Sequence, residues 1–230
     1  MKTIGLIGGM SWESTLEYYR IINQELRKRL GGLHSAKILM YSVDFGEVEP
    51  LMRVGDWDKI GDQVAQIAKR LESAGADCVL ICTNTVHKVA DRIEQAIGVP
   101  FIHIADAAGE EIVRRGLKNV GLLGTRYTME EDFYGSRLNK RFGLSILVPA
   151  EGERVLVNQV IFDELCQGVI AQSSRKRFQE IIAELASRGA EGIVLGCTEI
   201  PLLISQEDSP VPLFDTTLMH ALRAVDFALS

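Results

Sequence analysis

Two side chains that can exchange protons, the Thr83 hydroxyl and the Cys197 thiol, lie at matching positions in two similar halves of the chain. Two pairs of similar segments, named below, occur in register and in the same order in both halves, which indicates an internal duplication. If the halves face each other, a ligand between Thr83 and Cys197 is approached from both faces. Removing a proton from one face of an amino-acid α-carbon and returning it on the other is racemization. The matching segments are Arg70–Asn84 with Glu184–Thr198, and Ile4–Gly8 with Val120–Gly124.

The elements that must position these residues follow an alternating order. Short apolar runs alternate with longer segments of helical period, which is typical of βαβ units with a mostly parallel sheet. We predict strands over residues 3–7, 37–43, 77–82, 101–104, 119–123, 145–148, 192–195 and 213–214. We predict helices over residues 12–30, 57–74, 86–96, 106–115, 130–142, 155–167, 174–188 and 217–229. Ser11 is the expected cap of the first helix, and residues 44–51 are expected to form a loop.

This order predicts an α/β protein of two pseudo-symmetric parallel-sheet lobes with the active site in the cleft between them. We expect residues 1–102, completed by the C-terminal segment 212–230, to form the first lobe and residues 103–211 the second. Ligands of open α/β sheets bind beyond the carboxyl ends of the strands. Helices follow at least the first three of these ends, and their free N–H groups can hold a carboxylate. The ends are residues 8–11, 83–85, 124–128 and 197–199.

The segments IGLIGGMS, CTNTVH and GCTEIPLL together resemble the aspartate/glutamate racemase family. The resemblance covers essentially the whole chain. It implies a pseudo-duplicated α/β fold that needs neither pyridoxal phosphate nor a metal, and a homodimer is usual in that family. The two family motifs usually read Cys-Asn-Thr-x-His and Gly-Cys-Thr-Glu, and their cysteines are the acid/base pair. This chain has the second cysteine, Cys197, but it has Thr83 in place of the first.

The departure at Thr83 predicts an enzyme that handles one enantiomer better than the other. A thiol whose pKa is near 8.5 can be shifted into range at a helix N-terminus, so Cys197 can remove a proton. A threonine hydroxyl stays protonated near neutral pH and can only return a proton to a carbanion. In the family the second-half cysteine attends the L-isomer, so the resemblance favours L-aspartate or L-glutamate as substrate. Cys82 is a poor substitute because successive side chains of a strand point to opposite faces.

Substrate-binding residues are expected on the same loops. The resemblance implies that Met10 and Ser11 line the substrate cleft. Asn84, Thr85 and Thr198 would bind the α-carboxylate and the amine of the substrate.

Four further residues each have two interpretations. Arg53 is an ordinary solvated arginine or the cation that binds the distal carboxylate of the substrate, since arginine binds carboxylates bidentately. Thr125 donates to the substrate carboxylate or caps the following helix. Glu199 orients Cys197 or caps a helix. His87, one turn after the first motif, is more often structural than catalytic.

Composition excludes several other classes of function. A net charge of −6 and a pI of about 5.3 disfavour a nucleic-acid-binding protein. No apolar run approaches the roughly 18 residues that cross a bilayer, and the short N-terminal run fits a buried strand better than a signal peptide, so we expect a cytoplasmic protein. The cysteines have no zinc-site spacing, and Cys78 and Cys166 are expected to be inert thiols. The glycines after the first strand do not form a dinucleotide-binding motif.

Two alternative functions stay open at this point. A related isomerase or lyase of the same superfamily, such as a maleate isomerase or a decarboxylase, also uses a cysteine between the lobes. A catalytically inactive amino-acid-binding protein would retain the cleft without a second cysteine. Loss of the Cα proton together with loss of optical rotation distinguishes a racemase from both.

Overall fold

The computed structural model describes all 230 residues, and they form two compact units. The first unit contains Met1–Ile104 and His220–Ser230, and the second contains Ala105–Met219. The C-terminal segment therefore divides between the units at residue 220, whereas the sequence pattern places all of 212–230 with the first lobe. The physical reason is strand pairing: β7 (Leu213–Asp215) pairs in parallel with β6 (Gly192–Gly196) of the second sheet. None of the helices is long and apolar enough to cross a membrane.

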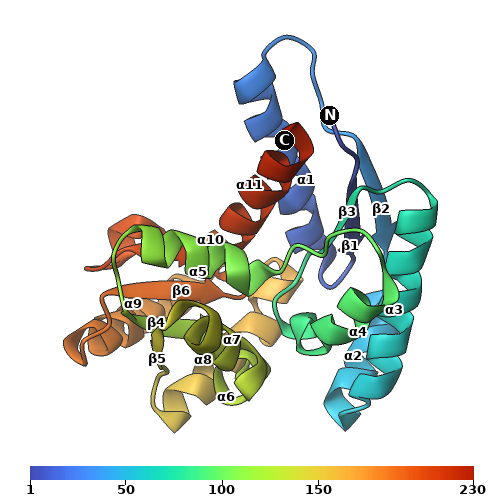
Figure 1. Cartoon of the computed structure of the whole chain (residues 1–230). Coiled ribbons are helices and arrows are strands. Elements are labelled where there is room, and N and C mark those ends of the chain that lie inside the picture. The colour runs from blue at the N-terminus through green and yellow to red at the C-terminus, as the bar shows by residue number, and fades with distance from the viewer. The chain divides into compact units, whose positions relative to one another are not determined.

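The first unit is built on a three-stranded parallel sheet in the order β2-β1-β3. Its core joins one face of this sheet to the helices α1 and α11, through residues such as Leu6, Tyr18 and Ala224. Helix α3 packs on β1, and Figure 1 shows it on the other side of the sheet from α1. The elements of this unit are β1 (Ile4–Gly8), α1 (Trp12–Leu30), β2 (Ile38–Ser42), α2 (Phe45–Val54), α3 (Trp57–Ser73), β3 (Cys78–Ile81), the 3₁₀ helix η1 (Thr85–Val89), α4 (Ala90–Ala96) and, from residue 220, α11 (Thr216–Leu229).

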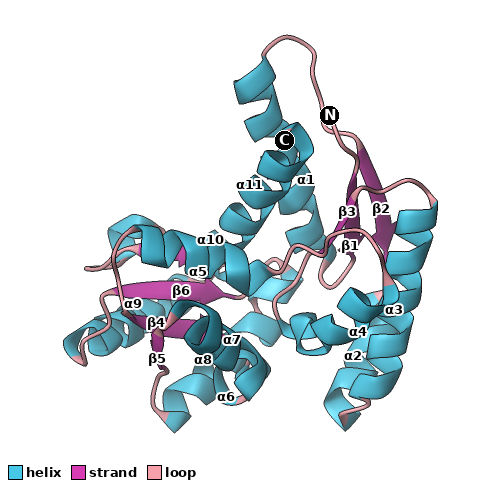
Figure 2. Cartoon of the chain, viewed as in Figure 1, coloured by secondary structure: helices cyan, strands magenta, loops and turns pink.

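The second unit is built on a four-stranded parallel sheet in the order β5-β4-β6-β7, and Figure 2 shows the strands of the two sheets in magenta. Helices α8 and α9 pack on β4, with Val157 and Phe178 fully buried in the core that they share with Leu123. The elements are α5 (Ile104–Arg114), β4 (Asn119–Gly124), α6 (Arg126–Glu130), α7 (Asp132–Phe142), β5 (Ser145–Leu147), α8 (Glu151–Asp163), η2 (Leu165–Gln167), α9 (Gln172–Ser187), β6, α10 (Ile200–Leu203), η3 (Gln206–Asp208) and β7.

The two sheets repeat the same local topology. In the first unit β1 lies between β2 and β3, and Thr83 follows β3. In the second unit β4 lies between β5 and β6, and Cys197 follows β6. Ile7 is paired with Ile81 in the first sheet, and Leu123 is paired with Leu195 in the second. Thr83 lies two residues after Ile81 and Cys197 lies two residues after Leu195, so the two residues occupy equivalent positions. The internal duplication expected from the sequence is therefore present in the strand register.

Two predicted segments have a different type of secondary structure from the one that the sequence predicts. Residues 44–51, expected to be a loop, belong to helix α2 or cap it: Asp44 caps the helix through Gly46 N–H, and Val48 and Met52 are buried. Residues 101–104, expected to be a strand, contribute only the single bridge between Val79 and Phe101. Pro100 lies before this bridge, and helix α5 already begins at Ile104, so no length is left for a ladder.

Candidate active site

The loop between β1 and α1 positions Met10 and Ser11 at the carboxyl end of the first sheet. Gly9 has φ of +92°, and a Cβ at this position would lie 2.2 Å from Val43 O, so the close approach to the neighbouring strand requires glycine. The Ser11 side chain accepts from Ser14 N–H and caps α1, as expected. Ser14 Oγ donates to Cys82 O at 3.0 Å and thereby joins this loop to the end of β3.

The segment after β3 carries Thr83, Asn84 and Thr85, all of which are buried. The last strand contact is Cys82 N–H to Ile7 O at 2.8 Å, so the chain leaves the sheet directly before Thr83. The structure therefore brings Met10, Ser11 and these three residues to one end of the first sheet. Cys82 points instead into the core of the first unit, and burial raises the pKa of its thiol far above the ordinary range.

The corresponding loop of the second unit positions Thr125 at the end of β4. Its side chain accepts from Thr128 N–H and caps α6, and the two hydroxyl oxygens lie 3.2 Å apart. The structure therefore supports the capping interpretation of Thr125.

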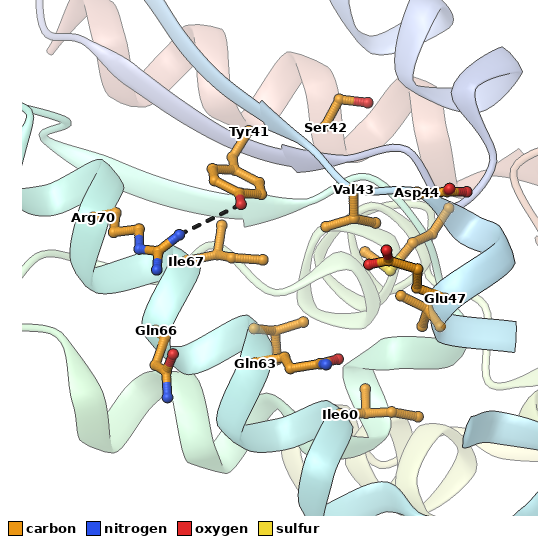
Figure 3. Close-up of a pocket in the computed structure, with 13 residues that line it drawn as sticks. Tyr41, Ser42, Val43, Asp44, Glu47, Ile60, Gln63, Gln66, Ile67 and Arg70 are labelled. Atoms are coloured by element: carbon orange, nitrogen blue, oxygen red, sulfur yellow. Dashed lines mark hydrogen bonds between the residues drawn. The ribbon is translucent and has the colours of Figure 1, made fainter. Parts of the chain in front are cut away.

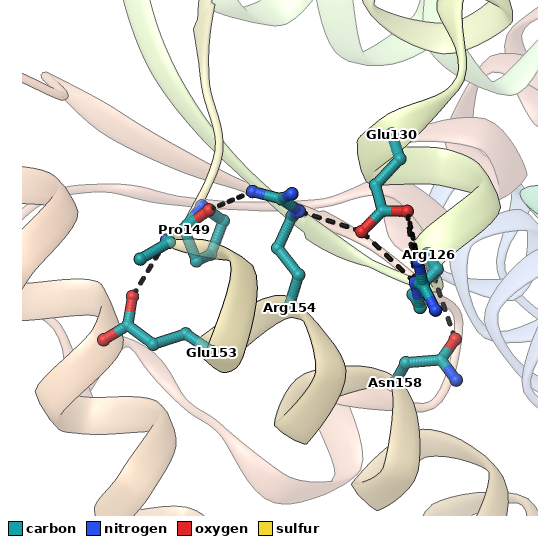
Figure 4. A network of polar contacts seen from close by, with 7 residues as sticks. Arg126, Glu130, Pro149, Glu153, Arg154 and Asn158 are labelled. Atoms are coloured by element: carbon teal, nitrogen blue, oxygen red, sulfur yellow. Dashed lines mark hydrogen bonds and ion pairs between the residues drawn. The ribbon is translucent and has the colours of Figure 1, made fainter.

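An ion-pair network holds the helix that follows Thr125 (Figure 4). Arg126 N–H donates to Asn158 Oδ1 at 2.9 Å, and its guanidinium pairs with Glu130. Glu130 also pairs with Arg154, which donates to Pro149 O. Because these contacts join α6 to α8, they fix the turn on which Thr125 lies.

Cys197 lies at the end of β6, buried and 3.0 Å from a carboxylate. Its thiol donates to Glu199 Oε2, and the Thr198 hydroxyl donates to the same oxygen at 2.8 Å. Glu199 is itself only 3% exposed and makes no side-chain capping bond to α10. Of the two interpretations of Glu199, the geometry supports the one in which it orients Cys197. The hydroxyl of Thr198, expected to bind substrate, is directed to Glu199.

The electrostatic environment of Cys197 differs from the expectation of a thiol activated by a helix N-terminus. Burial first, and then the negative charge of Glu199, raise the pKa of the Cys197 thiol well above its ordinary value. The helix that follows, α10, has only four residues, so its dipole offers little compensation. The thiol is therefore protonated at neutral pH, and it can act as a base only if a neighbouring group first takes its proton. The Glu199 carboxylate is in position to do so.

The first unit contains a pocket of about 280 Å³ between the end of β2, the start of α2 and helix α3 (Figure 3). Arg70 donates to Tyr41 OH at 3.4 Å at one side, and Asp44 and Glu47 lie at another. Of the substrate-binding residues expected from the sequence, only Met10 lines this pocket.

Arg53 lies on α2 with a largely exposed side chain that pairs bidentately with Glu49 one turn earlier. This arrangement is that of an ordinary solvated arginine, the first of the two interpretations made from the sequence. Glu49 and Arg53 are four residues apart on one helix, which is the spacing that favours such pairs.

A duplicated parallel α/β fold, with a thiol and a hydroxyl at equivalent strand ends, defines a protein of the amino-acid racemase type. A family model described as Asp/Glu/hydantoin racemase matches residues 7–224, and the chain belongs to this family. The family resemblance and the fold class expected from the sequence are thereby confirmed.

Individual relatives agree with this assignment. A crystal structure of a Yersinia pestis protein provisionally named an Asp/Glu racemase is 51% identical, with a TM-score of 0.94 over 100% of both chains. An aspartate racemase homologue from Pyrococcus horikoshii OT3 is 36% identical, with a TM-score of 0.87 over 100% of both chains. The broad specificity amino-acid racemase RacX of Bacillus subtilis is 25% identical over 99% of this chain and 98% of its own length.

Proposed function

We propose that the chain racemises L-aspartate or L-glutamate without a cofactor, with Cys197 as the base and Thr83 as the proton donor on the opposite face of Cα. The observation that carries this proposal is the buried Cys197 thiol, which donates to the buried Glu199 carboxylate at 3.0 Å. The equivalent strand-end positions of Thr83 and Cys197 support the pairing of their roles. Family membership supports an amino acid as the substrate.

The first chemical step needs Cys197 as a thiolate. Glu199 generates this thiolate by accepting the proton of the Cys197 thiol. The Cys197 thiolate then takes the Cα proton of the L-substrate and becomes a neutral thiol again. The electron pair left on carbon delocalises into the α-carboxylate, where N–H donors stabilise the developing charge. Asn84 and Thr85, at the N-terminus of η1, are the residues we propose for this binding.

The second step returns a proton to the other face of the carbon. The Thr83 hydroxyl gives its proton to the carbanion, which is the stronger base, and the C–H bond of the D-product forms. The alkoxide left on Thr83 recovers a proton from water, and Glu199 releases the proton that it accepted. Protons and charges therefore balance over one turnover. Because Thr83 cannot serve as a base at neutral pH, removal of the Cα proton is efficient only from the L-enantiomer.

A broader substrate range is the second candidate. The arginine expected to bind the distal carboxylate, Arg53, is exposed and paired with Glu49, which favours a site without a dedicated cation for that group. The similarity to a relative named as a broad specificity racemase supports the same possibility. The homodimer and the cytoplasmic location implied by the sequence stay predictions.

The test is incubation with L-aspartate, L-glutamate and a panel of neutral L-amino acids in D₂O, after dialysis against a chelator and with no added cofactor. We expect loss of the α-proton signal and of optical rotation for the acidic substrates. Retention of both the α-proton signal and the optical rotation would contradict a racemase. Equal rates across the panel would replace the acidic specificity with the broad one. A new product from maleate would instead support the isomerase alternative, and release of CO₂ would support the decarboxylase alternative.

A further inference from the structure

Three of the four histidines of the chain form a buried cluster in the first unit. His87, His103 and His220 are each 3% exposed or less. The ring centroid of His87 lies 4.5 Å from that of His103 and 5.7 Å from that of His220. A buried histidine with an unsatisfied ring nitrogen is destabilising, so the hydrogen-bond partners of each ring are informative.

The partners of His87 define its protonation state. Its Nδ1 lies 2.7 Å from Thr83 O, and a carbonyl only accepts, so Nδ1 carries the hydrogen. The backbone N–H of Ile104 donates to Nε2 at 3.3 Å, so that nitrogen carries none. The hydrogen-bond partners thus assign His87 as the neutral Nδ1–H tautomer.

The same assignment for His220 extends the network. Its Nε2 donates to Ile102 O at 2.7 Å, so its Nδ1 accepts from Tyr18 OH, also at 2.7 Å. Ile104 is the last residue of the first unit before the chain enters the second, Ile102 lies two residues earlier, and His220 is the first residue after the chain returns. His87 therefore joins the connection at Ile104 to the backbone of Thr83, and His220 joins the other connection to Ile102.

We propose that His87 is a positioning residue for the proton-return step, an inference that rests on the proposed role of Thr83. Thr83 is the second residue beyond β3, so its conformation is not set by a strand ladder. The bond from His87 Nδ1–H to Thr83 O fixes the peptide plane that follows Thr83 and with it the direction of the Thr83 side chain. The bond from Ile104 N–H in turn fixes the imidazole ring.

Two substitutions separate the two ends of the imidazole. His87→Asn places an amide N–H near the position of Nδ1 and retains the donor to Thr83 O. His87→Gln places an amide oxygen near the position of Nε2, which retains the acceptor for Ile104 N–H but removes the donor to Thr83. His87→Ala removes both, and His34→Asn on the exposed histidine is the matched control.

The measurement is made on the full-length protein, starting from the L-substrate in D₂O. It is the ratio of D-product formed to total deuterium incorporated at Cα. Deuteration without inversion reports the Cys197 step, and inversion reports the Thr83 step. We expect His87→Gln and His87→Ala to lower this ratio about 10- to 100-fold, the effect of a displacement of about 1 Å at a reacting group. His87→Asn and His34→Asn should stay within about threefold of wild type.

Several results would overturn the inference. A ratio unchanged in His87→Gln and His87→Ala, or both rates falling in parallel, would show a purely structural role for His87. Wild-type protein that exchanges no Cα proton would instead refute the proposed function. Independently of activity, ¹⁵N NMR of the histidines should show the Nδ1–H tautomer for His87. The Nε2–H form there would contradict the positioning role even in an active racemase.

Discussion

Glu199→Gln is the substitution that separates two opposite effects of one carboxylate. The charge of Glu199 contributes to the raised pKa of the Cys197 thiol, so its removal alone would lower that pKa and favour the thiolate. The same carboxylate is also the acceptor of the thiol hydrogen at 3.0 Å, so its removal deprives the thiol of its proton acceptor. The sign of the change in rate shows which effect dominates.

The structure favours a large loss of activity. Burial is the larger cause of the raised pKa of Cys197, and it persists in Glu199→Gln. A thiol of ordinary pKa is about 25% ionised at pH 8, and each further unit of pKa lowers the thiolate fraction about tenfold. The variant therefore has little thiolate and no internal base, and we expect the initial rate of Cα exchange from the L-substrate to fall about 10²- to 10⁴-fold.

The pH dependence of the exchange rate of Glu199→Gln is a second test of the role of Glu199 as proton acceptor. Without the carboxylate the rate should rise about tenfold per pH unit, because it follows the thiolate fraction of a thiol whose pKa lies above the range assayed. The wild-type rate should depend less on pH near neutrality. Glu207→Gln, on an exposed carboxylate of the same unit, is the matched control and should leave the rate unchanged. A Glu199→Gln rate within threefold of wild type, or above it, would refute the role of Glu199 as proton acceptor.

Three other predictions concern the thiols and the stability of the fold. Cys197→Ser should abolish turnover, whereas Cys82→Ser should leave most of it; the reverse result in an exchange assay would place the reactive thiol at Cys82. Gly109→Ala should lower the free energy of unfolding in urea by about 1–2 kcal/mol. Its Cβ would lie 2.4 Å from the Phe142 ring, so the overpacking costs about 2–3 kcal/mol, against a gain of about 1 kcal/mol in helix propensity. An equal or higher midpoint would contradict this. Arg175 holds the pKa of Asp208 below its ordinary value, so this contribution to stability is complete above pH about 4 and is lost as the pH falls further. Urea midpoints that change equally with pH in wild type and Asp208→Asn would rule out this contribution.

Local sequence patterns were sufficient to predict the helix that positions the first loop. Helix α1 begins at Trp12 and ends at Leu30, as predicted, because Ser11 caps its start and Gly31 follows its end. The duplication was equally visible, since the two halves repeat a strand, a glycine loop and a later helix–glycine–strand unit. This repeat made the fold class predictable from the sequence, and the strand registers confirm it.

Helix α2 could not be predicted for a physical reason. Pro50 lies inside it and lacks the N–H of a regular helical turn, a feature that usually ends or kinks a helix. Burial of Val48 and Met52 outweighs that loss, and such tertiary packing is not visible in the local pattern. As a consequence, Arg53 lies on helix α2 and pairs with Glu49 one turn earlier. The loop expected over residues 44–51 does not predict this pair.

The residues of the candidate site could be predicted in type but not in their contacts. The order Cys197, Thr198, Glu199 suggested two roles for the carboxylate, and only the side-chain geometry distinguishes the contact with the thiol from a helix cap. The pKa of Cys197 was expected to be low because a helix follows it. Its burial and the shortness of α10 reverse that direction, and the burial depends on packing from elements distant in the sequence.

The central claim is that Cys197 removes the Cα proton of the L-enantiomer efficiently, whereas Thr83 removes that of the D-enantiomer poorly. A substitution at Thr83 tests this claim most directly. The equilibrium constant of racemization is one, so both directions share the same overall kcat/KM. The asymmetry is therefore visible only in the initial rate of Cα exchange from each pure enantiomer in D₂O. Thr83→Cys restores a group that can act as a base on the D-enantiomer.

We expect the wild-type protein to exchange the L-enantiomer much faster than the D-enantiomer. In Thr83→Cys the exchange rate of the D-enantiomer should rise about 10²- to 10⁴-fold, which is the usual contribution of a general base. The exchange rate of the L-enantiomer should change far less, because Cys197 still removes that proton. Equal exchange of both enantiomers by the wild-type protein would contradict the assignment of Thr83 as the limiting acid/base group.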